Sequence, residues 1–444
     1  MDTSHTAMDT GDVAAACAAC GLLAVTLLAG GSSQQTGAGL TVAASMGIPL
    51  LAWGAWRRAQ APLGTLPAAW LVFAALVVLL PLFQLVPVPA EWGGKGRLEL
   101  QHDLLTMGAT APAQWTLAPV GVRSAVLALL PAAAVFVLTL GLPATGQRIV
   151  LMTVVALAMG SLLLGVAQLG APQESVLNPY PQWAPAMNGF FANPNHQATL
   201  LVVAATLACA GLAHALGAWP QRRRHRALAV LGSTVVLLLS LVALPLTGSR
   251  AGVVLVILAL GMVAALQWPL WRGSRRGRLA LVGGVAVAGS GLLAALRWMQ
   301  LDAVDELRAP LRAATGEIAS RYLATGSGVG SYVPVFEQEA PDELLMDDYV
   351  NHAHNEYLQW TLEAGLPAVA LMLAGAALLV ATIGAIRRLP ARQRVLPQAA
   401  LLGLVVVLAH SYVDYPLRTP AMLAVAAALA AVAATTRHAR PNPA

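Results

Sequence analysis

One arginine of this 444-residue sequence lies next to an apolar segment, where a charged side chain is energetically unfavourable. Arg250 follows Thr247, Gly248 and Ser249 and opens the apolar run AGVVLVILAL, so we expect it at a membrane boundary. Charged side chains at such positions are commonly functional, although an arginine at a helix end also extends to the headgroups without any further role. The neighbouring motifs favour a functional role.

Three further arginines precede a glycine-rich turn. Arg308, Arg312 and Arg321 come before the sequence GSGVGSY, in which every second residue is glycine. Such a turn permits positive φ angles and close backbone approach, and it can form an anion-binding nest. The alternative interpretation is a surface turn with solvated arginines.

A histidine-rich segment, VNHAHNEYLQWTLEAGL, leads directly into an apolar run. At helical spacing, one face carries His352, Glu356, Gln359 and Glu363, and His354 lies on another. We expect no metal ion here, because a zinc site needs three converging protein ligands and only His352 and Glu356 are evident. A histidine beside arginines at a membrane boundary is better explained as an acid, a base or a phosphate partner.

Two shorter motifs complete this set. The stretch NGFFANPNHQ contains Asn193, Asn195 and His196, and its proline and asparagines predict a helix start, so a cap and turn is the alternative to substrate binding. The stretch HSYVDYPLR marks a turn between two apolar runs. There we expect His410 and Asp414 to pair at i, i+4 in a structural role.

These motifs are set in a chain that is 58% hydrophobic and only 10% charged, whereas soluble domains carry about 25% charged residues. Without water, every backbone amide must be satisfied within its own segment, so apolar runs of about 20 residues are helices. The cysteines, Cys17, Cys20 and Cys209, lie in such runs, and we expect them to pack rather than to form disulfides or a redox or metal site. We therefore expect an all-α polytopic membrane protein with about twelve transmembrane helices.

The apolar runs place the helices along the whole chain, residues 1–444, as a single membrane domain. The predicted helices lie near 13–30, 38–56, 67–88, 122–142, 148–170, 197–217, 228–247, 250–268, 279–298, 360–386, 395–413 and 419–435. Three long connections remain, at about 89–121, 171–196 and 299–359, and the last is the largest and richest in polar residues. Long connections of this kind usually carry function.

Basic residues are sorted between the two sides of this arrangement. One set of connections and the C-terminal tail contain Arg57, Arg58, Arg148, Arg222, Arg223, Arg224, Arg226, Arg272, Arg275, Arg276, Arg278, Arg387, Arg388, Arg392, Arg394, Arg437 and Arg440. The connections between helices on this side contain no Asp or Glu. The positive-inside rule then places both termini in the cytoplasm and the motifs on the periplasmic side of a bacterial inner membrane. The net charge of +6 therefore indicates orientation and not nucleic-acid binding.

In this order, the motifs resemble those of the O-antigen ligase and polymerase superfamily of bacterial membrane proteins. The resemblance covers about residues 188–420 and rests on GFFANPNHQATL, TGSRAG, Arg308 ahead of GSGVGSY, AHNEYLQWTLEAGL and HSYVDYPLRTPA. It implies a C-type glycosyltransferase architecture. It also implies transfer of a glycan from an undecaprenyl-diphosphate carrier to an acceptor at the periplasmic face, with neither a metal nor another cofactor.

The resemblance also implies roles for single residues. Arg250 and Arg308 match the two arginines that engage the lipid diphosphate, and Arg312 stands where the family commonly has a tryptophan. His354 matches the histidine of the pattern His-Asn-x-x-Leu, which is His-Asn-Glu-Tyr-Leu here. The substrate-binding set that we expect also includes Arg321, Asn193, Asn195, His196, His352 and Asn355.

These roles agree with the chemistry of glycan transfer. Cleavage of the sugar C1–O bond leaves negative charge on the diphosphate, which guanidinium groups match bidentately without a metal. In a partly dry site such stabilisation lowers the barrier by several kcal/mol. His354 then acts as a general base or orients a substrate by hydrogen bonds, and direct attack predicts inversion at the anomeric carbon.

The sequence is compatible with several kinds of acceptor. We prefer a polymerase, because HSYVDYPLR resembles members near exopolysaccharide systems, over a ligase to lipid A core or a protein O-oligosaccharyltransferase. A polysaccharide or lipid transporter is the non-enzyme alternative, but it should have internal repeats and midplane charges. The expected partners are the undecaprenyl-diphosphate-linked glycan, a glycan or lipid-core acceptor, membrane lipid, and a chain-length regulator or another polysaccharide-assembly protein.

Overall fold

The computed structural model describes residues 8–33, 38–60, 64–87, 89, 95–109, 114–181, 186–216, 223–271, 304–345 and 351–435. Within these ranges the chain forms helices and turns, and no β-strand is present. Nine of the described helices are long and apolar enough to cross a membrane, and two shorter apolar helices, Arg250–Leu266 and Pro420–Ala434, join them. The protein is therefore an all-α polytopic membrane protein, as the sequence predicts.

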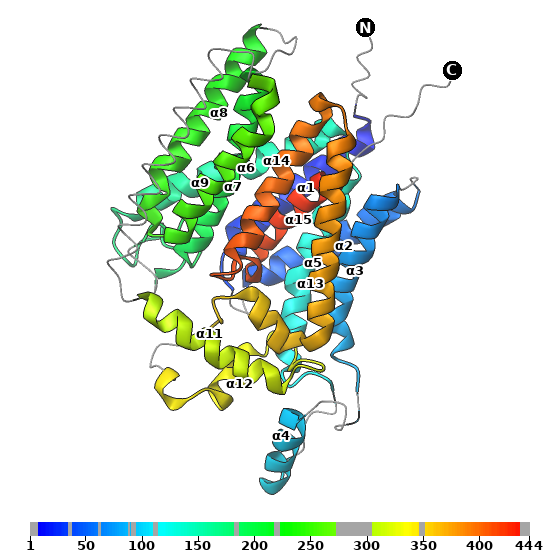
Figure 1. Cartoon of the computed structure of the whole chain (residues 1–444), viewed down its shortest axis with the longest axis vertical. Coiled ribbons are helices and arrows are strands. Elements are labelled where there is room, and N and C mark those ends of the chain that lie inside the picture. Colours follow the sequence, from blue (N-terminus) through cyan, green and yellow to red (C-terminus); the bar gives the residue numbers. More distant parts are fainter. Residues whose placement is uncertain are drawn as a thin grey trace.

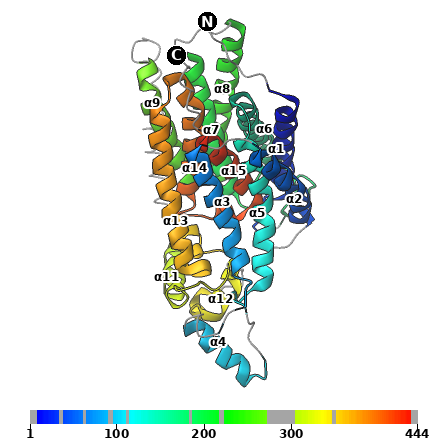
Figure 2. The same cartoon turned by 90° about the vertical axis from the view of Figure 1, so that its right-hand side faces the viewer.

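The long helices form one elongated bundle (Figures 1 and 2). They are α1 (Thr10–Ala29), α2 (Ala38–Ala59), α3 (Thr65–Phe83), α5 (Pro119–Leu140), α6 (Ala144–Gln168), α7 (Pro194–Leu216), α8 (Arg223–Ala243), α9 (Arg250–Trp271), α13 (Glu356–Arg388), α14 (Ala391–His410) and α15 (Pro420–Ala434). They coincide with the helices predicted from hydropathy. The helix predicted near 279–298 lies outside the described residues.

Helices α7, α14 and α15 form the centre of the bundle, and small side chains let them pack closely. In the apolar 18-residue stretch of α7, 67% is buried inside the protein, whereas only 11% of the equivalent stretch is buried in α3 and in α13. The outer helices thus present apolar faces that suit a lipid environment. Where helices approach most closely, glycine is required: a Cβ atom at Gly47 of α2 would lie 2.9 Å from the backbone nitrogen of Pro131 in α5.

The two ends of the bundle differ in charge. At one end, Arg57 at the end of α2 pairs with Asp12 at the start of α1, with 3.1 Å between Nη2 and Oδ1. Since successive helices alternate in direction, the same end gathers Arg58, Arg148, Arg223, Arg224, Arg226, Arg387, Arg388, Arg392 and Arg394. The opposite end carries α4 (Lys95–Thr106), α11 (Val304–Arg321) and α12 (Tyr332–Glu339), which extend beyond the bundle (Figures 1 and 2).

Helix α13 departs from the prediction in two respects. It begins at Glu356, before the predicted start, and it is broken at Gly365, which has φ 56° and ψ −145° and precedes Leu366 and Pro367. The break frees backbone groups that need new partners, because no water is available inside the bundle. The amide of Leu366 donates to the carbonyl of Leu323 at 2.7 Å.

The glycine-rich turn supplies the remaining partners of this break. Ser327 N donates to Leu362 O at 3.0 Å, and Gly328 N donates to Glu363 O at 2.8 Å. Gln84, just after α3, joins the two segments: its Nε2 donates to Glu363 O at 2.9 Å, and its Oε1 accepts from the next turn amide, that of residue 329, at 2.8 Å. Both sequence-based interpretations of this turn, an anion-binding nest and a solvated surface turn, are therefore wrong, since the turn is buried and its amides are used within the protein.

We expect Gly328→Ala to lower the free energy of unfolding by about 2 kcal/mol or more. Gly328 has φ 115°, and a Cβ atom there would overlap Thr116 Oγ1. Thermal unfolding in detergent measures the effect. Gly384→Ala in α13 is the matched control, because a Cβ atom at that position meets nothing within 4 Å. Equal stability of the two variants would contradict the tight docking of the turn.

Candidate active site

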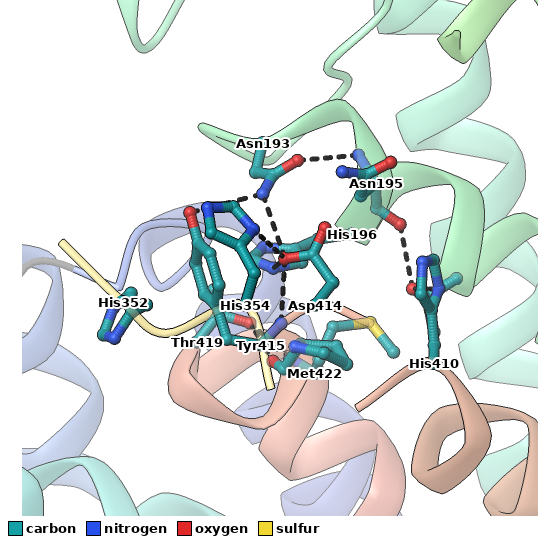
Figure 3. Close-up of polar contacts among 12 residues, drawn as sticks. Asn193, Asn195, His196, His352, His354, His410, Asp414, Tyr415, Thr419 and Met422 are labelled. Carbon is teal, nitrogen blue, oxygen red and sulfur yellow. Dashed lines mark hydrogen bonds and ion pairs between the residues drawn. The ribbon is translucent and has the colours of Figure 1, made fainter. Parts of the chain in front are cut away.

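Three segments that are distant in the sequence meet at the end of the bundle opposite the arginine-rich end. They are the start of α7 with Asn193 and His196, residues 351–355 ahead of α13, and the turn between α14 and α15 with Asp414 and Tyr415. Figure 3 shows their side chains converging on the carboxyl group of Asp414. We call these residues the Asp414 cluster.

Asp414 is the charged centre of the cluster, and its side chain is only 1% exposed. Its Oδ1 atom lies 3.7 Å from His196 Nε2 and 3.6 Å from His354 Nδ1. The same oxygen accepts hydrogen bonds from Asn193 Nδ2 at 3.4 Å and from the Tyr415 amide at 2.8 Å. Burial opposes ionisation, but the two imidazoles outweigh it and hold the pKa of Asp414 well below its usual range. Asp414 is therefore a buried carboxylate.

Tyr415 keeps the imidazoles of the cluster apart. Its ring centroid lies 4.2 Å from that of His352, 4.9 Å from that of His196 and 5.0 Å from that of His354. The last two contacts are edge-to-face, which is a favoured arrangement of aromatic rings. Burial and the charge of Asp414 raise the pKa of Tyr415 to about 12. The phenol thus stays protonated and acts as a fixed spacer.

His354 is the imidazole of the cluster that a substrate can reach. Its side chain is 25% exposed although its Nδ1 atom is buried, so the exposed edge is the one that carries Nε2. His196, His352 and His410, in contrast, are buried. His354 is also the only described residue other than glycine with a positive φ, 48°. A residue of this kind is uncommon in that region, and such strain is typical of functional sites.

The backbone around His354 is anchored on both sides. Asn355 caps α13, with its side-chain oxygen accepting from Leu358 N at 3.1 Å. Glu356 fastens the start of α13 to the turn after α14, because its amide donates to Ser411 O at 2.9 Å and its Oε1 accepts from Leu417 N at 2.6 Å. These bonds hold His354 in register with the Asp414 turn.

The predicted polar face of α13 forms a buried chain. His352 Nδ1 lies 3.1 Å from Gln359 Nε2, which donates to Glu363 Oε1 at 3.0 Å. Glu363 Oε2 pairs with Arg418 Nη1 at 2.6 Å. Burial and the charge of Arg418 hold the pKa of His352 well below its ordinary value, so this imidazole is neutral. His352 therefore supports the cluster from inside the protein.

The structure places the start of α9, which carries Arg250, beside the start of α7, and Arg308 near enough to act on groups of the cluster. Arg250 begins α9, and a Cβ atom at Gly252 in the same turn would lie 2.8 Å from the Cβ of Ala198. The first turn of α9 thus packs against the first turns of α7, which also carry His196. Arg308 is half-buried in α11, and its charge opposes the rise in the pKa of Tyr415.

The other loop arginines differ in their surroundings. Arg312 is half-buried one helical turn after Arg308 and lies on the same face of α11. Arg321 lies about 20 Å beyond Arg308 along this helix. There its guanidinium group pairs with Glu339 at 3.1 Å and with Glu317 at 3.6 Å. The structure does not bring Arg321 to the Asp414 cluster.

One pairing predicted from the sequence is wrong. The side chains of His410 and Asp414 do not pair: the Asp414 amide donates to the His410 carbonyl at 2.9 Å, but the Asp414 carboxylate faces His196 and His354. Instead, His410 Nδ1 lies 2.6 Å from Thr199 Oγ1 of α7. Asn195 takes part in the start of α7, where its backbone amide donates to Asn193 Oδ1 at 2.8 Å.

Sequence reasoning missed Asp414 and Tyr415 as members of the site. The sequence does contain a feature that could have identified Asp414. It is the one acidic residue of the stretch HSYVDYPLR, and apolar helices flank this stretch. A charge in such a place needs partners. The sequence does not reveal which histidines provide them.

The cluster combines two chemical abilities. An ionised carboxylate behind His354 Nδ1 favours the tautomer whose Nε2 accepts a proton at the exposed edge. Arginines at the same end of the bundle provide charge for an anionic group. Among the described residues, no group of three or more His, Cys, Asp and Glu side chains is arranged to hold a metal ion.

Comparison with known proteins gives one match. Residues 235–373 match a family model described as O-antigen ligase. The matched range includes Arg250, Arg308 and His354, whereas His196 and Asp414 lie outside it. No curated protein matches the chain.

We expect Asp414→Asn to lower the free energy of unfolding by about 1–3 kcal/mol, because a neutral amide stabilises the facing imidazole N–H groups less well. The pKa of Asp414 is depressed in the folded protein. The Asp414 carboxylate therefore stabilises the fold fully above the pKa of about 3.9 that an aspartate has in the unfolded chain. This stabilisation is lost as the pH falls toward the lower pKa of Asp414 in the folded protein. Thermal unfolding should show the difference from about pH 5 to about pH 8.

The control for this measurement is Arg57→Gln, which removes a partly exposed ion pair at the opposite end of the bundle. We expect it to cost less than about 1 kcal/mol. If Asp414→Asn were no more destabilising than this control, the carboxylate would not be the centre of the cluster.

Proposed function

We propose that this chain transfers a glycan from a polyprenyl-diphosphate carrier to a hydroxyl group of an acceptor glycan. The similarity of residues 235–373 to the O-antigen ligase family model supports this proposal. The observation that carries the proposal is the exposed edge of His354, backed by the buried carboxylate of Asp414. This pair lies at the bundle end that also carries Arg250 and Arg308.

In this proposal the arginines bind the donor. Arg250 and Arg308 hold the diphosphate, and Arg312 adds charge from the same face of α11. Guanidinium groups match phosphate oxygens bidentately, and they stabilise the negative charge that grows as the sugar C1–O bond breaks. Arg321 is left out of this role, because its charge is already compensated by Glu339 and Glu317.

His354 activates the acceptor. The proton of the acceptor hydroxyl moves to His354 Nε2 while the oxygen attacks C1, and the electrons of the breaking C1–O bond pass to the diphosphate. Asp414 stabilises the imidazolium ion through Nδ1, as a carboxylate does behind a general base. Attack opposite the leaving group inverts the anomeric configuration. NMR of the product linkage tests this, and retention would reject it.

The distribution of charge supports an orientation for the protein. Arginines at one end of the bundle, without acidic residues in the connections between those helices, indicate the cytoplasmic side. The Asp414 cluster then faces the periplasm, and both termini lie in the cytoplasm. The location that we propose is the inner membrane, because a lipid-linked donor is available there.

We expect His354→Asn and Arg250→Ala each to lower the transfer rate by a factor of about 100 or more. Asparagine is the better replacement for His354, because it tolerates a positive φ angle and removes only the imidazole. The measurement is transfer from a lipid-linked oligosaccharide by the purified protein. Arg123→Ala, an exposed arginine near the start of α5, is the control and should keep full activity. Full transfer by both site variants would refute the proposed site.

The acceptor distinguishes a polymerase from a ligase. We propose a polymerase, on the resemblance of HSYVDYPLR to members near exopolysaccharide systems, with a chain-length regulator or another assembly protein as partner. Deletion of the gene should then leave single repeats on the carrier and at the cell surface, in an analysis of surface glycans and lipid-linked intermediates. Long chains stranded on the carrier would instead identify a ligase. Normal surface polysaccharide with unglycosylated protein would identify transfer to protein.

A further inference from the structure

His196 was expected to contact substrate, but it lies behind the cluster. Its side chain is 1% exposed, in the first turn of α7. Both ring nitrogens are buried, and neither has a hydrogen-bond partner within 3.5 Å. The nearest charged atom is Asp414 Oδ1, 3.7 Å from His196 Nε2. At 1% exposure, this imidazole is not open to a substrate.

One carboxylate oxygen therefore faces two imidazoles. Asp414 Oδ1 lies between the His196 and His354 rings at nearly equal distances, 3.7 and 3.6 Å. The second oxygen, Oδ2, is buried and has no hydrogen-bond partner. Figure 3 shows the two rings approaching this carboxylate from different segments of the chain. Asp414 therefore contacts His354 and His196 through the same oxygen atom.

We propose that His196 is a positioning residue that acts on His354 through their common carboxylate and sets the pH range in which His354 is able to accept a proton. This inference rests on the proposed function. His196 presents its Nε2 edge to Asp414, with 3.7 Å between Nε2 and Oδ1. In the transfer step the acceptor proton moves to His354 Nε2, the Nδ1 proton stays between His354 and Asp414, and His196 takes no part in the proton transfer.

The sign of the effect follows from the charge on Asp414. An N–H of His196 that points at the shared oxygen from 3.7 Å partly offsets its negative charge and weakens its stabilisation of protonated His354. Without that contact, Asp414 holds the proton of His354 more strongly. His354 then becomes available as a base only at higher pH, so the acid side of the activity profile moves upward.

Other titratable or charged groups lie around the cluster and are unchanged by substitution of His196. They are His352, His354 and Glu356 ahead of and at the start of α13, His410, Tyr415 and Arg418 at the end of α14 and in the following turn, Arg308 of α11 and Arg250 at the start of α9. A shift that follows substitution of His196 alone is therefore assigned to its contact with Asp414.

The experiment compares His196→Leu with His196→Gln. Leucine removes the N–H donor, whereas the glutamine amide nitrogen reaches the position of the imidazole Nε2 and donates without titrating. We expect the acid limb of the kcat profile to move up by about one pH unit in His196→Leu, the size of one charge-assisted contact, and to stay in place in His196→Gln. The KM for the lipid-linked donor should change in neither variant, because His196 does not touch the donor.

His410→Leu is the matched control. His410 is equally buried, at 1% exposure, but its ring bonds to Thr199 and not to the Asp414 carboxylate. Its substitution should leave the acid limb in place even where it lowers the yield of folded protein. An unmoved limb in His196→Leu, or the same shift in His410→Leu, would overturn the inference. If His196→Leu does not fold, His196→Asn takes its place, since its shorter amide does not reach Asp414 and should cause the same shift.

Different results would reject the role of His196 and the proposed function. Loss of transfer in His354→Asn together with an unmoved limb in the His196 variants would reject only the role of His196. Full transfer in His354→Asn would reject the proposed function itself, and the role of His196 with it.

Discussion

A charge buried at the end of a membrane bundle must be compensated, and in this protein that charge is Asp414. Isolation of a carboxylate from water costs several kcal/mol unless donors surround it. Here the donors come from the start of α7, from the segment ahead of α13 and from the turn after α14. Compensation of one charge therefore brings together three segments that hydropathy alone would leave unrelated.

The rest of the fold makes that meeting point rigid. Glu356 fixes α13 to the turn after α14, and the Glu363–Arg418 pair fixes the next helical turn. The break at Gly365 then turns the chain, and the glycine-rich turn satisfies the freed carbonyls. Since this turn follows α11 directly, the helix that carries Arg308 is held by the same hydrogen bonds that stabilise the break in α13.

Much of this arrangement could be predicted from the sequence, for physical reasons. Helix spans follow from hydropathy because an apolar medium leaves the backbone no alternative to helices. The location of Arg250 and His354 at one end follows because each lies next to an apolar run. The break at Gly365 could not be predicted, since a hydropathy profile carries no φ angle. The helices α4, α11 and α12 were missed because they contain no long apolar run.

The partners of Asp414 were unpredictable for a different reason. Spacing of i, i+4 suggests a pair with His410, and the Asp414 amide does donate to the His410 carbonyl at 2.9 Å. The carboxylate nevertheless faces His196 and His354, which come from distant parts of the sequence.

The Asp414 cluster also crosses the limit of the family domain. The matched range, 235–373, contains both proposed diphosphate arginines and His354, but it ends within α13. The carboxylate behind His354 comes from the turn before α15, and the second imidazole comes from α7. In the proposed mechanism the matched range thus provides the groups that touch the substrates, and the flanking segments provide the carboxylate and the second imidazole behind His354. Because these two sets meet at Asp414, the mechanism predicts that a change in the packing of α7 or α15 acts on His354, although neither helix needs to contact a substrate.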